Sequence, residues 1–270
     1  MAPSDGGTTV TLPGPIIPPM PIAPPAGLPR RPKVGLYEQN AWAMVLGSEV
    51  PSVIVFADGS AIRQRAPVAA GGDPRLVEGR LANVATLLRE LERELIALPE
   101  KTSVSHATDQ PTTSILLETD QGWIRRAVYG IALGCQAVPH ATQPAPAGFL
   151  AACRALLDAP TIDEHDYMIE KVEVMLWDYE HSPETPAPWP KTVPPPPAVA
   201  PPQKGVVSHA IDGRHLERLR SFLASLGPRQ AVAFNDHKWS VEVRVLLPGD
   251  AHLTHVNRET WRVYAETLNA

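Results

Sequence analysis

The chain contains little cysteine and no long apolar run, and each shortage excludes a class of protein. Two of its 270 residues are cysteines, too few for a disulfide-rich scaffold or a four-cysteine zinc site. We expect Cys135 and Cys153 to be buried free thiols, because an unpaired cysteine packs as a small hydrophobic side chain. No stretch approaches the roughly 18 consecutive apolar residues of a membrane-spanning helix.

Basic charge is also scarce. The net charge is −5, and the longest basic cluster is the short segment 30–33. Nucleic acids and anionic membrane surfaces are bound by concentrated basic patches, so we expect neither as a partner. Prolines interrupt the apolar residues of the first thirty positions, and no positively charged segment precedes them, which argues against a secretory signal. These features predict a cytoplasmic protein.

Motifs for common chemistries are missing as well. The sequence has no Gly-x-Ser-x-Gly turn, no glycine-rich phosphate loop and no metal-ligand spacing, so we expect no cofactor and no metal. Acidic side chains surround an imidazole at Asp163, His165 and Asp166, which could serve a hydrolase-type enzyme. The simpler interpretation of this stretch is a solvated turn.

Proline, in contrast, is abundant and marks the boundaries of the folded regions. Ten of the 31 prolines lie in residues 1–32 and ten more in residues 183–202. Fixed φ angles and missing N–H groups favour extended, polyproline-like chain in both tracts. We therefore divide the chain into a tail (1–32), a main domain (33–182), a connector (183–204) and a small unit (205–270) that packs on the main domain.

Two hairpins with a helix between them dominate the main domain. Apolar and polar residues alternate over 52–65 around Asp58-Gly59 and over 112–131 around Asp120-Gln121-Gly122, a pattern typical of β-hairpins. Between them, apolar residues recur at spacings of three and four, which predicts an amphipathic helix. The members of this apolar stripe are Leu81, Val84, Leu88, Leu91 and Leu95.

The remaining elements complete an α+β fold. We expect a strand over 41–46, a helix over 149–157 and a long strand over 167–179 in the main domain. In the small unit, a helix capped by Asp212 precedes a hairpin around Asn235-Asp236, and residues 258–268 predict a closing helix. Antiparallel hairpins packed on amphipathic helices, with a smaller helix-plus-hairpin unit at the C-terminal end, make an α+β protein.

Aromatic residues gather where the long strand meets the connector. Trp177, Tyr179 and Trp189 lie there, the last within Pro188-Trp189-Pro190. Tryptophan is enriched at the centres of protein interfaces, so these three are our candidate binding residues. The alternative is that Trp189 fills the domain edge and anchors the connector.

The chain resembles a broad group of functionally unassigned bacterial proteins, many of them lipoproteins. The matching features are the Asp58-Gly59 hairpin, Pro111-Thr112-Thr113, Val128-Tyr129 and Pro188-Trp189-Pro190, within residues 50–190. Unlike that group, the chain has no lipobox cysteine near its start, so we expect no membrane tether. It is also faintly similar to the emfourin-type metalloprotease inhibitors in its order of strand pair, helix and strand pair. Neither resemblance implies a catalytic residue.

Together these features predict a non-enzymatic protein-binding module of the inhibitor or immunity type, which acts by occluding a protein partner. Two alternatives stay open. One is an enzyme that uses Asp163, His165 and Asp166, and the other is a structural scaffolding component.

Overall fold

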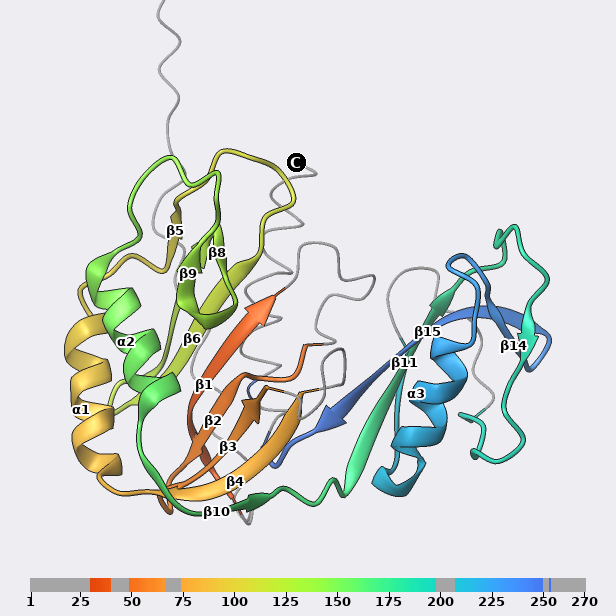
Figure 1. Ribbon diagram of the computed structural model, residues 1–270, viewed down its shortest axis with the longest axis horizontal. Coiled ribbons are helices and arrows are strands. Elements are labelled where there is room, and N and C mark those ends of the chain that lie inside the picture. Colours follow the sequence, from red (N-terminus) through yellow and green to blue (C-terminus); the bar gives the residue numbers. More distant parts are fainter. Residues whose placement is uncertain (1–29, 40–48, 67–73, 198–206, 250–252, 254–270) are drawn as a thin grey trace, which may run out of the picture.

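Three α-helices and three β-sheets, of eight, five and two strands, make up the described part of the chain (Figure 1). The structure is a computed structural model, and it describes residues 30–39, 49–66, 74–197, 207–249 and residue 253. It confirms the predicted α+β fold. The expected strand over 41–46 and the expected closing helix over 258–268 lie outside the described residues.

The first sheet has eight strands in the order β10-β4-β3-β2-β1-β6-β7-β5. Most neighbours are antiparallel, and β5 joins the edge in parallel with β7. Its strands are β1 (Pro32–Gln39), β2 (Val53–Phe56), β3 (Ser60–Arg65), β4 (Arg75–Leu81), β5 (Lys101–Ser103), β6 (Thr112–Thr119), β7 (Gly122–Tyr129) and β10 (Thr161–Asp166).

Both predicted hairpins of this sheet are confirmed. The β2–β3 turn has Gly59 at φ +83°, and the Asp58 carboxylate accepts a hydrogen bond from the Ser60 N–H at 2.9 Å. The β6–β7 turn has Gly122 at φ +111°. Glycine adopts positive φ angles without steric cost because it has no Cβ, so it suits both turns.

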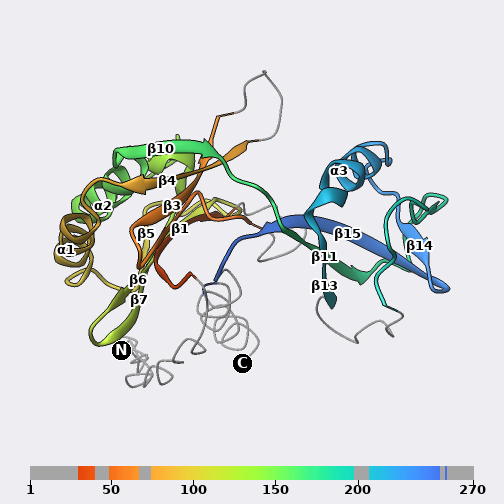
Figure 2. The same cartoon turned by 90° about the horizontal axis from the view of Figure 1, so that it is seen from below.

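Helices α1 (Val84–Leu95) and α2 (Ala147–Asp158) cover one face of the first sheet, as Figures 1 and 2 show from two directions. Leu87, Leu91 and Leu95 of α1 are buried in the core between helices and sheet. The predicted stripe is therefore confirmed in its main direction, with Leu88 half-buried at its border.

The start of α1 was predicted three residues too early. Leu81 ends strand β4, and its N–H donates to the Gly59 carbonyl at 2.9 Å. Its distance from Val84 and Leu88 fits the helical repeat by coincidence, because a short apolar pattern does not distinguish the end of a strand from the start of a helix. Strands β1 and β4 were not predicted from the sequence.

The prediction of free thiols is wrong, because Cys135 and Cys153 form a disulfide. The bond ties α2 to the short segment that holds β8 (Ile131–Ala132), a 3-10 turn (Leu133–Cys135) and β9 (Gln136–Ala137). Both cysteines are buried, as predicted. Burial follows from local apolar context, but the pairing depends on a contact between segments that sequence spacing does not reveal.

The second sheet has five strands in the order β12-β14-β15-β11-β13, and α3 (Leu216–Ala224) packs against it. A 3-10 turn (Gly213–His215) leads into α3, and Asp212 accepts a hydrogen bond from the Arg214 N–H at its start. The strands are β11 (Lys171–Asp178), β12 (Ala187–Pro188), β13 (Val207–Asp212), β14 (Val232–Phe234) and β15 (His237–Leu246). The predicted hairpin is confirmed, with Asn235 and Asp236 both at positive φ between β14 and β15.

The strand predicted over 167–179 is confirmed only from Lys171 onward, because residues 167–170 form no strand. Residues 171–178 form β11, which lies between β13 and β15 in the second sheet, while residues 161–166 form β10 at the edge of the first. A shared core cluster joins the two sheets. It combines Ile54 and Phe56 from the first sheet with Val174 and Trp239 from the second.

Candidate binding groove

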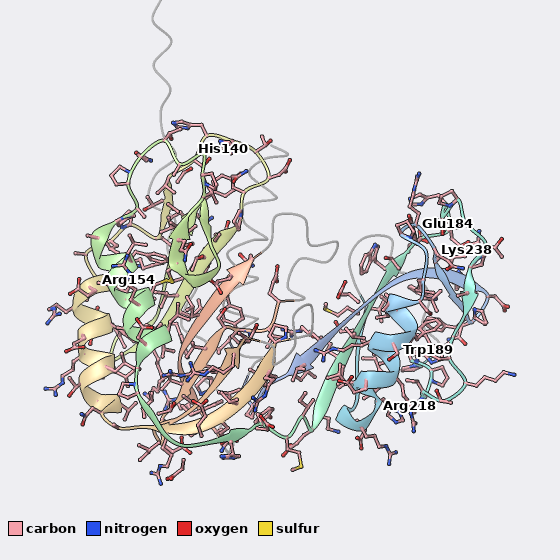
Figure 3. All side chains as sticks on the ribbon, viewed as in Figure 1. His140, Arg154, Glu184, Trp189, Arg218 and Lys238 are labelled. Carbon is pink, nitrogen blue, oxygen red and sulfur yellow. A yellow bond between two sulfur atoms is a disulfide. The ribbon has the colours of Figure 1, made fainter. Side chains whose placement is uncertain are left out.

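Trp189 is part of the core of the second sheet. Its side chain is 9% exposed, and its indole N–H donates to the Val193 carbonyl at 3.0 Å. Its ring, labelled in Figure 3, packs edge-on against Phe234 at 5.2 Å between centroids. Phe234 in turn stacks on Trp239. These contacts fix the segment that follows β12 onto the sheet, as the anchoring alternative requires.

Trp177 and Tyr179 do not share this face. Trp177 is half-buried on β11, opposite Ser240, whereas Trp189 packs near Trp239 on the face that carries α3. Neighbouring strand residues point to opposite faces, so Trp177 and Trp189 lie on opposite sides of the sheet. Tyr179 follows the end of β11, and its ring contacts His181 edge-on at 5.1 Å. The structure therefore does not bring the three candidate binding residues into one site.

The acidic stretch around His165 is an exposed edge strand and not the expected solvated turn. Its carboxylates face arginines of neighbouring strands: Glu164 pairs with Arg65 at 2.8 Å, and Asp166 pairs with Arg75. The hydrogen bond from Arg65 holds the pKa of Glu164 below its ordinary value. The imidazole of His165 is 66% exposed. These contacts give the acidic groups a structural role at the sheet edge.

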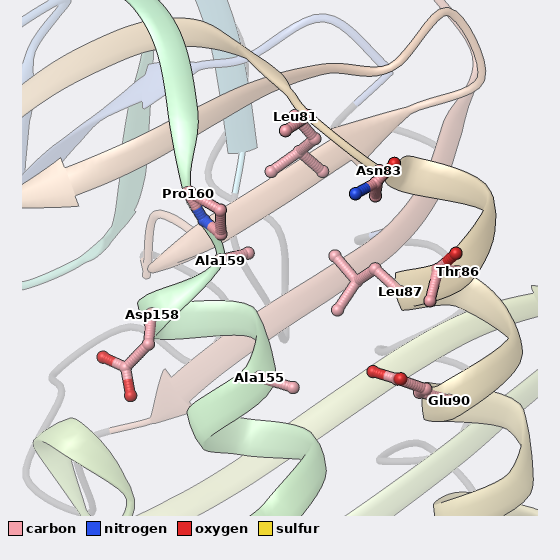
Figure 4. Close-up of a pocket in the computed structure, with 10 residues that line it drawn as sticks. Leu81, Asn83, Thr86, Leu87, Glu90, Ala155, Asp158, Ala159 and Pro160 are labelled. Carbon is pink, nitrogen blue, oxygen red and sulfur yellow. The ribbon is translucent and has the colours of Figure 1, made fainter.

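A groove opens where β4, α1 and α2 end or begin (Figure 4). Its volume is about 300 Å³, near the lower limit of small-molecule sites and sufficient for one long side chain. The lining comes from three places: the end of β4 with the start of α1, the inner face of α1, and the end of α2. The lining residues are Leu81, Ala82, Asn83, Thr86, Leu87, Glu90, Ala155, Asp158, Ala159 and Pro160.

The groove combines apolar walls with negative charge. Figure 4 shows the Glu90 side chain extending from α1 toward α2, while the carboxylate of Asp158 points outward. Within the described part of the chain, Glu90 makes no ion pair and no side-chain hydrogen bond. The C-terminal end of α2 carries a partial negative charge, and the N-terminal turn of α1, which also lines the groove, carries a partial positive charge of similar size. The net negative charge of the groove therefore comes from the carboxylates of Glu90 and Asp158. This arrangement suits a ligand group with an apolar stem and a cationic end.

A buried arginine lies beneath the same end of α2. Arg63 of β3 is 2% exposed and donates from Nη1 to the Leu157 carbonyl at 3.3 Å. Burial lowers the pKa of Arg63, and the charge of Asp158 opposes that shift. The Arg63 guanidinium thus supplies a hydrogen-bond donor to a carbonyl near the end of α2.

Sequence reasoning did not find this groove. Leu81 was assigned to the apolar stripe of one helix and Ala155 to a second helix, and Leu87 was not singled out. The groove exists only because the ends of separate elements meet, and no local pattern records that meeting. In the described residues, no group of three or more His, Cys, Asp or Glu side chains could hold a metal ion, and no helix is long and apolar enough to cross a membrane.

Comparison with protein-family models, curated proteins and solved structures gives no match.

Proposed function

We propose that the protein is a non-enzymatic protein-binding module of the inhibitor or immunity type, and that its groove receives a lysine or arginine side chain of the partner. The observation that supports this is the pairing of apolar walls with the unpaired carboxylate of Glu90. Lysine and arginine place an apolar stem behind a charged head, and arginine is enriched among residues that dominate interfaces.

The experiment places a photocrosslinking residue at Thr86, on the border of the groove, and exposes the folded protein to an extract of its native host. We expect one protein to be captured in a stoichiometric complex. Lys191, an exposed residue outside the groove, is the control position. The same crosslinker placed there should not capture the partner protein.

Reversing the charge at the groove should weaken the complex. Glu90→Lys is expected to reduce affinity about tenfold, because two cations would then face each other across the contact. Glu92→Lys makes the same charge change on α1 outside the groove lining and should leave affinity within about threefold of wild type. Capture that is unaffected by Glu90→Lys would contradict the proposed site. If the protein turned over a substrate and His165→Ala abolished that turnover, the enzyme alternative would replace this proposal.

We further propose that the protein works in an oxidising compartment and not in the cytoplasm predicted from its sequence. The supporting observation is the Cys135–Cys153 disulfide, since such bonds are rare where thioredoxin and glutathione keep thiols reduced. Protein taken from its native host and denatured without reductant should show no thiol that reacts with a maleimide. Two reactive thiols per chain would contradict this proposal and favour the cytoplasmic location predicted from the sequence.

A further inference from the structure

The sheet edges differ in how they are protected against pairing with another strand. In the first sheet, β5 has only three residues, and β10 carries a bulge, Asp163 at φ +56° and several carboxylates. In the second sheet, β12 has two residues, one of them Pro188. Short length, bulges, charge and proline are the devices by which proteins prevent edge-to-edge association.

Strand β13 has none of these devices. It runs for six residues, Val207–Asp212, in an uninterrupted antiparallel register with β11. Its sequence, Val-Ser-His-Ala-Ile-Asp, has small or uncharged side chains up to the final residue. It is the longest regular open edge among the described strands.

The hydrogen-bond register shows which backbone groups of β13 point outward. The Gly213 N–H donates to the Glu170 carbonyl at 2.8 Å, so this pair faces β11. Because hydrogen-bonded pairs alternate along antiparallel strands, the N–H and C=O groups of Ser208, Ala210 and Asp212 point away from β11. All three residues are exposed. Among the described residues, the N–H and C=O groups of Ser208 and Ala210 and the N–H of Asp212 have no hydrogen-bond partner, whereas the Asp212 carbonyl accepts the first hydrogen bond of the 3-10 turn that Asp212 caps.

We propose that this edge binds β13 of a second copy of the chain, in antiparallel register, with a twofold axis through Ala210. In this register Ala210 faces its own copy, and Ser208 faces Asp212 on each side of the axis. The Ala210 pair can exchange two backbone hydrogen bonds, and in each outer pair the Asp212 N–H can donate to the Ser208 carbonyl. The two five-stranded sheets then form one continuous sheet.

Side-chain chemistry favours a second copy. Across the axis no like charges face each other: the hydroxyl of Ser208 meets the carboxylate of Asp212, and the two Ala210 methyl groups leave the backbones room to approach. The same pairing at β10 would bring together strands that carry Asp163, Glu164 and Asp166, and like charges on facing strands are destabilising. The surface buried along six residues is small compared with that of permanent dimers, so the dimer is expected to dissociate on dilution.

The experiment is sedimentation equilibrium of the full chain from micromolar to near-millimolar concentration. Wild type should shift from monomer to dimer across this range. Ala210→Pro removes an outward N–H that β11 does not use, so it should abolish the dimer while the circular dichroism spectrum and melting temperature stay close to wild type. Ala210→Thr keeps that N–H and should still dimerise.

Charge exchange at the axis tests the register itself. Ala210→Lys and Ala210→Glu each place like charges opposite each other and should weaken the dimer at least tenfold. An equimolar mixture of the two variants should dimerise again, because the introduced lysine of one chain would then face the introduced glutamate of the other. Wild type that stays monomeric at every concentration, a dimer that survives Ala210→Pro, or a mixture that stays monomeric would each overturn the proposal.

Discussion

Single side chains from the first sheet complete the ends of the two helices that cover it. Arg126 of β7 donates to the carbonyls of Leu95 and Ile96, at 2.8 and 3.1 Å, where α1 ends. Arg63 does the same for Leu157 near the end of α2, whose last turn has no basic residue of its own. Helix carbonyls without an intrahelical partner are thus satisfied from another element. Sequence patterns cannot predict such caps, because the donor is distant in the chain.

Tyr167 gives a residue-scale prediction in the segment between the two sheets. Burial, followed by the charges of Glu170 and Glu78, raises the pKa of Tyr167 to about 12. The folded state therefore favours the neutral phenol, and the stability it contributes is complete below the ordinary tyrosine pKa near 10 and is lost as the pH rises toward about 12. Phenolate absorbance titrations of wild type and Tyr167→Phe should differ by a transition with a midpoint near 12. A difference transition near 10 would contradict this environment.

Among the elements, helix α1 shows what the periodicity of apolar residues predicts and what it leaves open. The spacing of apolar residues predicted the helix and the side that it buries, and Leu91 and Leu95 are fully buried as expected. The centre of the stripe, however, is Leu87, Leu91 and Leu95, with Leu88 beside it. A difference of one position rotates the helix by about 100°, and only contacts with α2 and the sheet decide between such neighbours.

The corrected orientation gives an element-scale prediction. Leu91→Ala should lower the free energy of unfolding by about 2–5 kcal/mol, because it leaves a cavity in the core between α1 and the sheet. Leu88→Ala should cost less, since its side chain is only half-buried. Arg89→Ala, on the exposed face, should change stability by no more than about 0.5 kcal/mol. Urea denaturation measures all three, and a larger loss at Leu88 than at Leu91 would contradict the orientation.

Across the whole molecule, local sequence signals predicted where the hairpins turn but not which strands pair with each other in the sheets. Asp58-Gly59 and Asn235-Asp236 predicted their turns, because the turn conformation is encoded in the turn residues themselves. The exposed strand β10 lacks alternation and was missed, and only residues 171–178 of the strand predicted over 167–179 form a strand, β11 of the second sheet. The disulfide and the groove also arise from contacts between distant segments, so they were beyond sequence reasoning.

We propose that the groove between α1 and α2 binds a cationic side chain. The most direct test is an amide nuclear magnetic resonance titration of the full chain with n-butylammonium, a mimic of the lysine side chain, and with uncharged n-butanol as the matched control. We predict shifts centred on Thr86, Glu90 and Ala155 with butylammonium, several-fold weaker binding by Glu90→Gln, and little response to butanol. Shifts of equal size with butanol, shifts away from the groove, or unchanged binding by Glu90→Gln would contradict the claim.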